Sequence, residues 1–220
     1  MSLVIAFCGR DRSFMAGDRR EIVFRGDDLR TRTLEDELYS GRIRSRDALH
    51  ERARELGIDL WIHDDRCKAW EEDGILIGQV SERDGLSTRS RRLCVSCGNY
   101  VITEVQEGIK REVTRGCASR FIVLGNKTTQ EIAHRCIRSH WSDTGGTPAD
   151  ALRIIILAME EAASLTPSVS GTYTLVQTTA KTVLPPQGKT QRSLVFPIFF
   201  LSFAIPGGQC DTEGRGVRLP

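Results

Sequence analysis

The chemistry that this sequence could carry begins at its second residue. Ser2 follows the initiator methionine, and Asp18 lies sixteen positions later. A methionine before a small residue is normally removed, which would leave Ser2 with a free α-amine. That amine has a reference pKa of about 7.7–8.0, so part of it can accept the serine proton near neutral pH. Asp18 could orient the ammonium group and the hydroxyl through charge-assisted hydrogen bonds.

A β-hairpin is predicted to bring these two residues together. Residues 3–8 are continuously apolar, which is typical of a strand buried on both faces. Residues 9–12 have turn chemistry, and residues 13–17 return as the partner strand. Two strands of similar length joined by a short turn place their outer ends side by side. The sequence therefore predicts a nucleophile with a supporting acid.

These residues resemble the start of proteasome β-subunits and related N-terminal-nucleophile hydrolases. Those proteins begin with Thr or Ser and carry an acid at this spacing, followed by Arg, as Ala16-Gly17-Asp18-Arg19 does here. The chain resembles more closely an uncharacterised proteasome-like family of methanogenic archaea. The shared elements are Ala-Gly-Asp-Arg-Arg, Leu38-Tyr39-Ser40-Gly41, a Leu-Gly-Asn-Lys turn and Thr-Pro-Ser-Val-Ser. The resemblance runs from residue 2 to about residue 178.

The resemblance implies further site residues. Ser170-Gly171 matches a Ser-Gly pair that supports the nucleophile in proteasome-like enzymes. Arg19 or Arg32 would add positive charge near the reacting oxygen. Arginine can stabilise an oxyanion in this way, but it effectively never gives up its proton.

Two positions depart from the proteasome pattern. Proteasome β-subunits place a lysine about thirty-two residues after the nucleophile, where it lowers the hydroxyl pKa. Here that position is Leu34, and no lysine precedes Lys68. The acid that normally comes before Ser-Gly is replaced by Thr166 or Pro167. We therefore interpret the α-amine as the only evident base.

The remaining elements predict an α+β fold. Short strands fill residues 58–124, interrupted by a polar linker at 81–92. A capping box at 128–131 begins one helix, Thr147-Pro148-Ala149-Asp150 begins another, and a strand follows at 172–177. With the resemblance, this implies a four-layer αββα sandwich of two antiparallel sheets over residues 2–180. One short helix, at about 46–56, stands where proteasome subunits have two, so we expect a smaller homo-oligomer instead of a double ring.

The composition limits the classes of partner that we expect this protein to bind. A net charge of +2, with 31 basic and 29 acidic residues, gives no reason to expect a nucleic-acid or anionic-membrane partner. No stretch reaches the roughly 18 apolar residues of a membrane helix. Seven cysteines without a secretion signal predict reduced thiols in a cytoplasm. Cys94 and Cys97 form a single C-x-x-C, whereas structural zinc needs four ligands, so no metal or cofactor is predicted.

Residues 181–220 differ in amino-acid composition from the rest of the chain. Leu184-Pro185-Pro186 is followed by an aromatic burst at 195–201 and by Pro206-Gly207-Gly208. One hypothesis is an edge strand that completes a sheet. The other is a shifted reading frame near residue 180.

Two functional hypotheses remain open. The first is an N-terminal-nucleophile amidohydrolase or peptidase that cleaves a peptide or small amide through an acyl-enzyme on Ser2. The second is a non-catalytic subunit of proteasome fold with a role in assembly or binding.

Overall fold

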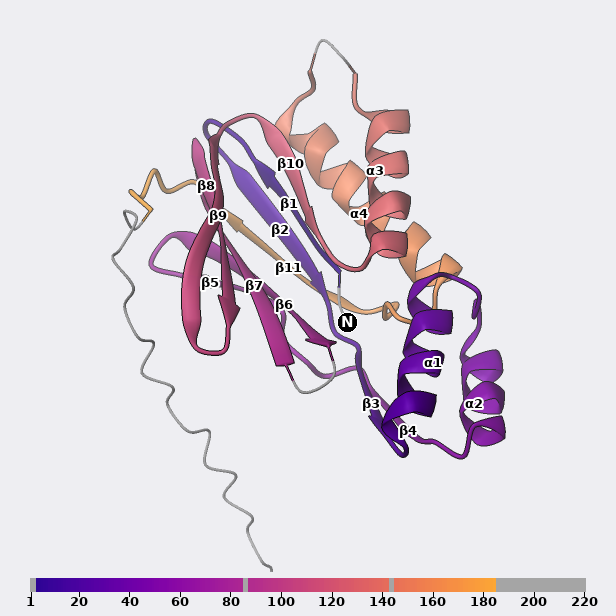
Figure 1. The fold of residues 1–220 in the computed structure, drawn as a ribbon. Coiled ribbons are helices and arrows are strands. Elements are labelled where there is room, and N and C mark those ends of the chain that lie inside the picture. Colours follow the sequence, from indigo (N-terminus) through magenta and orange to yellow (C-terminus); the bar gives the residue numbers. More distant parts are fainter. Residues whose placement is uncertain (1–2, 85–86, 143–144, 185–220) are drawn as a thin grey trace, which may run out of the picture.

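The computed structural model describes residues 3–84, 87–142 and 145–184, and most of its strands form two antiparallel sheets (Figure 1). The first sheet has the order β10-β1-β2-β11, and the second has the order β5-β6-β7-β8-β9. The first comprises β1 (Val4–Cys8), β2 (Ser13–Asp18), β10 (Arg120–Leu124) and β11 (Tyr173–Thr178). The second comprises β5 (Ala69–Glu72), β6 (Ile75–Asp84), β7 (Ser87–Ser96), β8 (Asn99–Gln106) and β9 (Ile109–Cys117).

The predicted hairpin at the start of the chain is confirmed as β1 and β2. Val4 pairs with Gly17, and Phe7 pairs with Phe14. Alternate residues face opposite ways, so Ile5 packs toward the helices while Val4 packs toward the second sheet. Both faces of this strand are therefore covered, which is why its sequence is continuously apolar.

Helices α3 (Lys127–His140) and α4 (Pro148–Leu165) cover the outer face of the first sheet (Figure 1). The predicted capping box at 128–131 is wrong, because the side chain of Asn126 caps α3 by accepting from Thr129 N. The predicted start of α4 is confirmed. Thr147 and Asp150 exchange side-chain and backbone hydrogen bonds in a capping box, and Pro148 is the first helical residue.

Replacing Thr147 by alanine is expected to lower the free energy of unfolding by about 1 kcal/mol, because the cap of α4 loses its acceptor. Urea denaturation would measure the change. Ser164→Ala, in the last turn of the same helix, is the control. Equal midpoints for the two variants would contradict the assignment of the cap.

A two-stranded ribbon and two helices form a separate unit beside the sandwich (Figure 1). The ribbon consists of β3 (Glu21–Arg25) and β4 (Asp59–His63), and α1 (Asp28–Tyr39) and α2 (Arg46–Glu55) pack on one of its faces. The unit touches α3 where Thr128 Oγ1 donates to the carbonyl of Tyr39 at 2.7 Å.

The expectation of one short helix in this region is wrong, because α1 precedes the predicted α2. Its sequence is rich in charge, and only Leu34 and Leu38 are buried. Two apolar positions one turn apart are a weak periodic signal, although the cap at Asp27 was present in the sequence. Leu34, which stands at the proteasome lysine position, belongs to the core of this unit.

The predicted linker at 81–92 is also wrong, since its described residues, 81–84 and 87–92, belong to the paired strands β6 and β7. Ser81 is exposed, and residues 89–92 are partly exposed, so this part of the hairpin lacks apolar alternation. The α+β prediction of two antiparallel sheets packed face to face, with helices outside, is confirmed. Of the atypical segment predicted at 181–220, residues 185–220 lie outside the described residues, and the two hypotheses about them stay predictions.

Candidate active site

The side chain of Asp18 is fully buried at the end of β2 and is surrounded by donors. Its Oδ2 accepts from Leu3 N at 2.7 Å, and its Oδ1 accepts from Arg20 N at 2.8 Å. The backbone N of Asp18 in turn donates to the carbonyl of Leu3 at 3.0 Å. Ser2 lies outside the described residues, but the residue that follows it in the sequence is fixed on Asp18 by two hydrogen bonds.

Lys68, which the proteasome spacing did not indicate, completes the surroundings of Asp18. Its Nζ lies 3.0 and 2.9 Å from the two carboxylate oxygens and also donates to the carbonyl of Arg20. Lys68 is 5% exposed. Burial lowers the pKa of its ammonium group, and the attraction of Asp18 opposes that shift.

The lysine comes from a different part of the chain than the proteasome spacing suggests. Strands β3 and β4 pair with Glu21 opposite His63, so the segments that flank them emerge at the same end. Residues 18–20 and 64–68 are thereby brought together across the ribbon. Counting residues from Ser2 does not find this lysine. Pairing the two apolar runs at 22–24 and 60–62 as strands would have placed it near Asp18.

Asp64 lies four residues before Lys68 and is linked through Arg20 to the turn before Ser170. Asp64 receives Arg20 in a bidentate pair, with Nε–Oδ1 at 2.8 Å and Nη2–Oδ2 at 2.7 Å. The Nη1 group of Arg20 donates to the carbonyls of Pro167 and Val169 at 2.9 and 3.0 Å. The hydrogen bonds from Arg20 hold the pKa of the Asp64 carboxyl below its ordinary value.

The predicted Ser170-Gly171 element lies against the same network. Ser170 is fully buried, and its Oγ accepts from Arg19 N at 3.4 Å and from Thr172 N at 3.1 Å. The hydroxyl donates to the carbonyl of Thr172. Gly171 is exposed, with open space where a side chain would stand. Ser170 is thus fixed next to the strand end that carries Asp18.

The two arginines named from the sequence have different positions. Arg19 Nη2 donates to the carbonyl of Asp65 at 3.4 Å, and its Nε is buried without a partner among the described residues. Arg32 is exposed on α1, outside the contacts of Asp18. The structure therefore brings together Asp18, Arg19 and Ser170, adds Arg20, Asp64 and Lys68, and leaves Arg32 apart.

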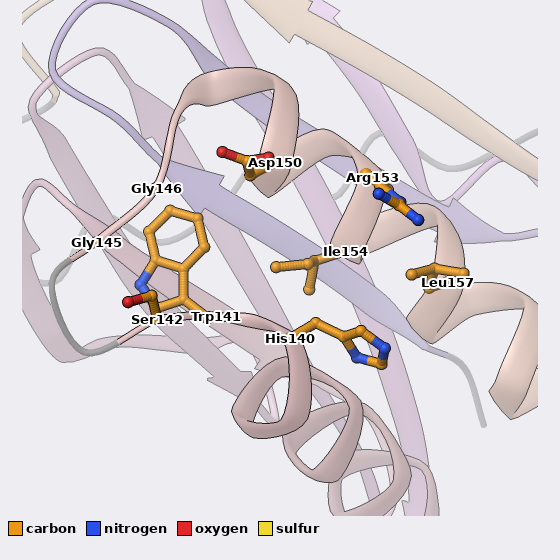
Figure 2. Close-up of a pocket in the computed structure, with 9 residues that line it drawn as sticks. All are labelled: His140, Trp141, Ser142, Gly145, Gly146, Asp150, Arg153, Ile154 and Leu157. Atoms are coloured by element: carbon orange, nitrogen blue, oxygen red, sulfur yellow. The ribbon is translucent and has the colours of Figure 1, made fainter.

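A separate hollow lies between the end of α3 and the start of α4 (Figure 2). Its volume is about 200 Å³, and its lining includes His140, Trp141, Asp150, Arg153 and Ile154. His140 Nδ1 lies 2.9 Å from the carbonyl of Cys136 one turn earlier. None of the residues around Asp18 lines this hollow. Across the described ranges, no group of three or more His, Cys, Asp or Glu residues is placed to hold a metal ion.

The C-x-x-C motif occupies the end of β7 and the turn that follows it. Cys97-Gly98 is the two-residue turn between β7 and β8, and Gly98 adopts a φ of +93°. The buried Cys97 thiol donates to the carbonyl of Thr178 at 3.4 Å, while Cys94 is partly exposed. Cys94 therefore lies within β7, and Cys97 lies in the turn after it.

Two antiparallel sheets packed face to face, with helices on the outer face of the first and a buried acid at the end of the first hairpin, define an α+β sandwich. Residues 1–193 match the family described as "Connectase MJ0548-like, N-terminal domain", and the chain belongs to that family.

Solved structures with a similar arrangement share little sequence with this chain. HslV from Trypanosoma brucei is 12% identical, over 80% of this chain and 98% of that chain, with a TM-score of 0.46. Anbu (ancestral beta-subunit) from Yersinia bercovieri is 12% identical over 80% of each chain, with a TM-score of 0.38. A search of curated protein sequences found no match. In the described part of the chain, no helix is both long enough and apolar enough to cross a membrane.

Proposed function

We propose that this chain is an N-terminal-nucleophile amidohydrolase or peptidase in which Ser2 forms the acyl-enzyme. One observation carries the proposal. The buried Asp18–Lys68 pair is bonded directly to the backbone of Leu3, the residue after Ser2. A structural ion pair elsewhere in the core would have no connection to the start of the chain.

The proposed reaction uses the α-amine of Ser2 as its base. Ser2 Oγ attacks the amide carbonyl carbon while the α-amine takes the hydroxyl proton. The C–N bond then breaks, and the leaving amine carries that proton away. Water attacks the resulting ester and gives one proton to the α-amine. When the carboxylic acid leaves, that proton returns to Ser2 Oγ.

In this proposal Lys68 takes the electrostatic role that the sequence suggested for Arg19 or Arg32. A cation near Ser2 favours the ionised form of its hydroxyl and the developing oxyanion. Asp18 holds the lysine and the backbone of Leu3 in fixed positions. Arg19 and Ser170-Gly171 support the strand end from behind, through the hydrogen bond between Arg19 N and Ser170 Oγ.

The setting of the reaction is part of the same proposal. We assign a peptide or small amide as substrate, a homo-oligomer as the working form, and the cytoplasm of a methanogenic archaeon as the location. All six cysteines in the described ranges are unpaired thiols, which fits a reducing compartment.

The test is covalent labelling of the purified protein. Intact mass is measured first and is expected to show that Met1 has been removed. Incubation with an acylating electrophile such as a β-lactone should add one adduct, and fragmentation should place it on Ser2. Ser2→Ala should show no adduct.

A retained methionine would exclude the proposed nucleophile, because no free α-amine would stand on Ser2. An unlabelled protein whose Met1 is removed would favour the alternative, a non-catalytic subunit of the same fold.

A further inference from the structure

The segment 64–68 is tied to its neighbours at several points besides Lys68. Arg66 N donates to the carbonyl of Arg19 at 3.0 Å, and Arg19 Nη2 reaches the carbonyl of Asp65. The strongest tie is the Arg20–Asp64 pair, in which two parallel N–H···O bonds fix both distance and angle.

The guanidinium of Arg20 also holds the turn before Ser170. The side chain of Arg20 is 11% exposed, and its Nη1 serves the carbonyls of Pro167 and Val169. One side chain therefore cross-links three separate stretches of the chain: its own, at 18–20, the segment 64–68 and the turn 167–170. The bidentate pair with Asp64 fixes the orientation of this guanidinium group.

The position of Lys68 Nζ depends on how firmly the backbone of the segment 64–68 is held. Its ammonium group stands at the end of four flexible carbons, so the path of its backbone decides where Nζ can reach. That backbone lies four residues from Asp64. The charged groups that act on Lys68 are Asp18, Glu21 and Asp64.

We propose that Asp64 is a positioning residue that, through Arg20, locks the segment 64–68 onto the turn 167–170 and so holds Lys68 Nζ on Asp18. Its catalytic consequence rests on the function proposed above, because it is Lys68 that would assist Ser2. In this proposal the acid that supports the turn before Ser170-Gly171 is Asp64, which directly follows strand β4 of the ribbon.

The test combines two readouts on Asp64→Asn. The first is the rate constant for β-lactone labelling of Ser2, which is expected to fall about tenfold as Lys68 loses its fixed position. The second is the pKa of Lys68, measured by NMR titration of the lysine Cε signals. The chain has five lysines, at positions 68, 110, 127, 181 and 189, and Lys68→Arg assigns the signal.

The direction in which the pKa of Lys68 changes distinguishes a positioning role of Asp64 from a purely electrostatic one. Removing the negative charge of Asp64 alone would lower the pKa of Lys68 further, because Asp64 favours the charged ammonium group. Releasing the segment would expose Lys68 to water and raise its pKa toward the ordinary value. We expect the rise. A fall, or an unchanged labelling rate, would overturn the proposal.

Three variants complete the design. Asp64→Glu keeps the carboxylate and should restore labelling to within about threefold, whereas Arg20→Lys keeps the charge without the fork and should resemble Asp64→Asn. Asp11→Asn removes the carboxylate of an exposed ion pair with Lys181 and is the matched control. If the wild type is not labelled, the proposed function fails, while the NMR titration still tests the positioning role on its own.

Discussion

Replacing Lys68 by methionine is expected to abolish labelling of Ser2 and to lower the free energy of unfolding by about 3–5 kcal/mol. The stability effect arises because the carboxylate of Asp18 is fully buried and would lose the cation that is bonded to it. Removing one partner of a buried pair costs more than the pair contributes, since the remaining ion has lost its water. Urea denaturation and the mass-spectrometric labelling assay measure the two effects.

The control and the rescue make this prediction specific. Lys181→Met removes the cation of an exposed pair with Asp11 and should change stability by less than about 0.5 kcal/mol. Lys68→Met combined with Asp18→Asn removes both charges and should recover part of the lost stability without recovering labelling. If the single variant were as stable as Lys181→Met, the buried pair would not exist in solution.

Replacing Gly17 by alanine is expected to destabilise the protein by about 1–3 kcal/mol and to disturb the acid–lysine pair. A Cβ at Gly17 would lie 2.9 Å from the Cβ of Ala69 and 3.2 Å from the carbonyl carbon of Lys68. These atoms belong to a short side chain and to backbone, so they can yield only if β2 and the segment before β5 separate. This separation would move Asp18, which follows Gly17, away from Lys68, which precedes Ala69.

Gly26→Ala is the matched control for this substitution. A Cβ at Gly26 meets Ile58 at 3.4 Å, which is an ordinary contact. Stability is followed by urea denaturation, and the Lys68 signal is followed by NMR. If the Gly17 and Gly26 variants had the same midpoint, the close approach of the two sheets at this point would be wrong.

Local signals in the sequence were enough to predict the first hairpin and most of the sandwich. The β1–β2 hairpin follows from an apolar run, a turn and a return, which are all contained in residues 3–18. The start of α4 follows from Thr147 and Pro148. Helix α1 was missed because a peripheral helix needs few buried side chains, and two leucines among charged residues do not define a face.

Half of the candidate site escaped prediction for a different reason. Asp18 and Ser170 belong to motifs that can be recognised along the chain, whereas Asp64 and Lys68 become neighbours of Asp18 through the pairing of β3 with β4. The intervening residues form the ribbon and two helices, and their number says nothing about the distance between the two ends. A long-range contact of this kind follows from which strands pair and in what register, and the spacing of Asp18 and Lys68 along the chain contains neither.

The β3–α1–α2–β4 unit lies between Asp18 and Lys68 in the sequence, and its outer part can vary in length while its two ends stay paired. Its two chain ends are fixed by the pairing of Glu21 with His63, whatever the length of the helices beyond them. Insertions or deletions between residues 26 and 58 can therefore reshape the outer part of this unit while the Lys68–Asp18 distance stays at about 3 Å.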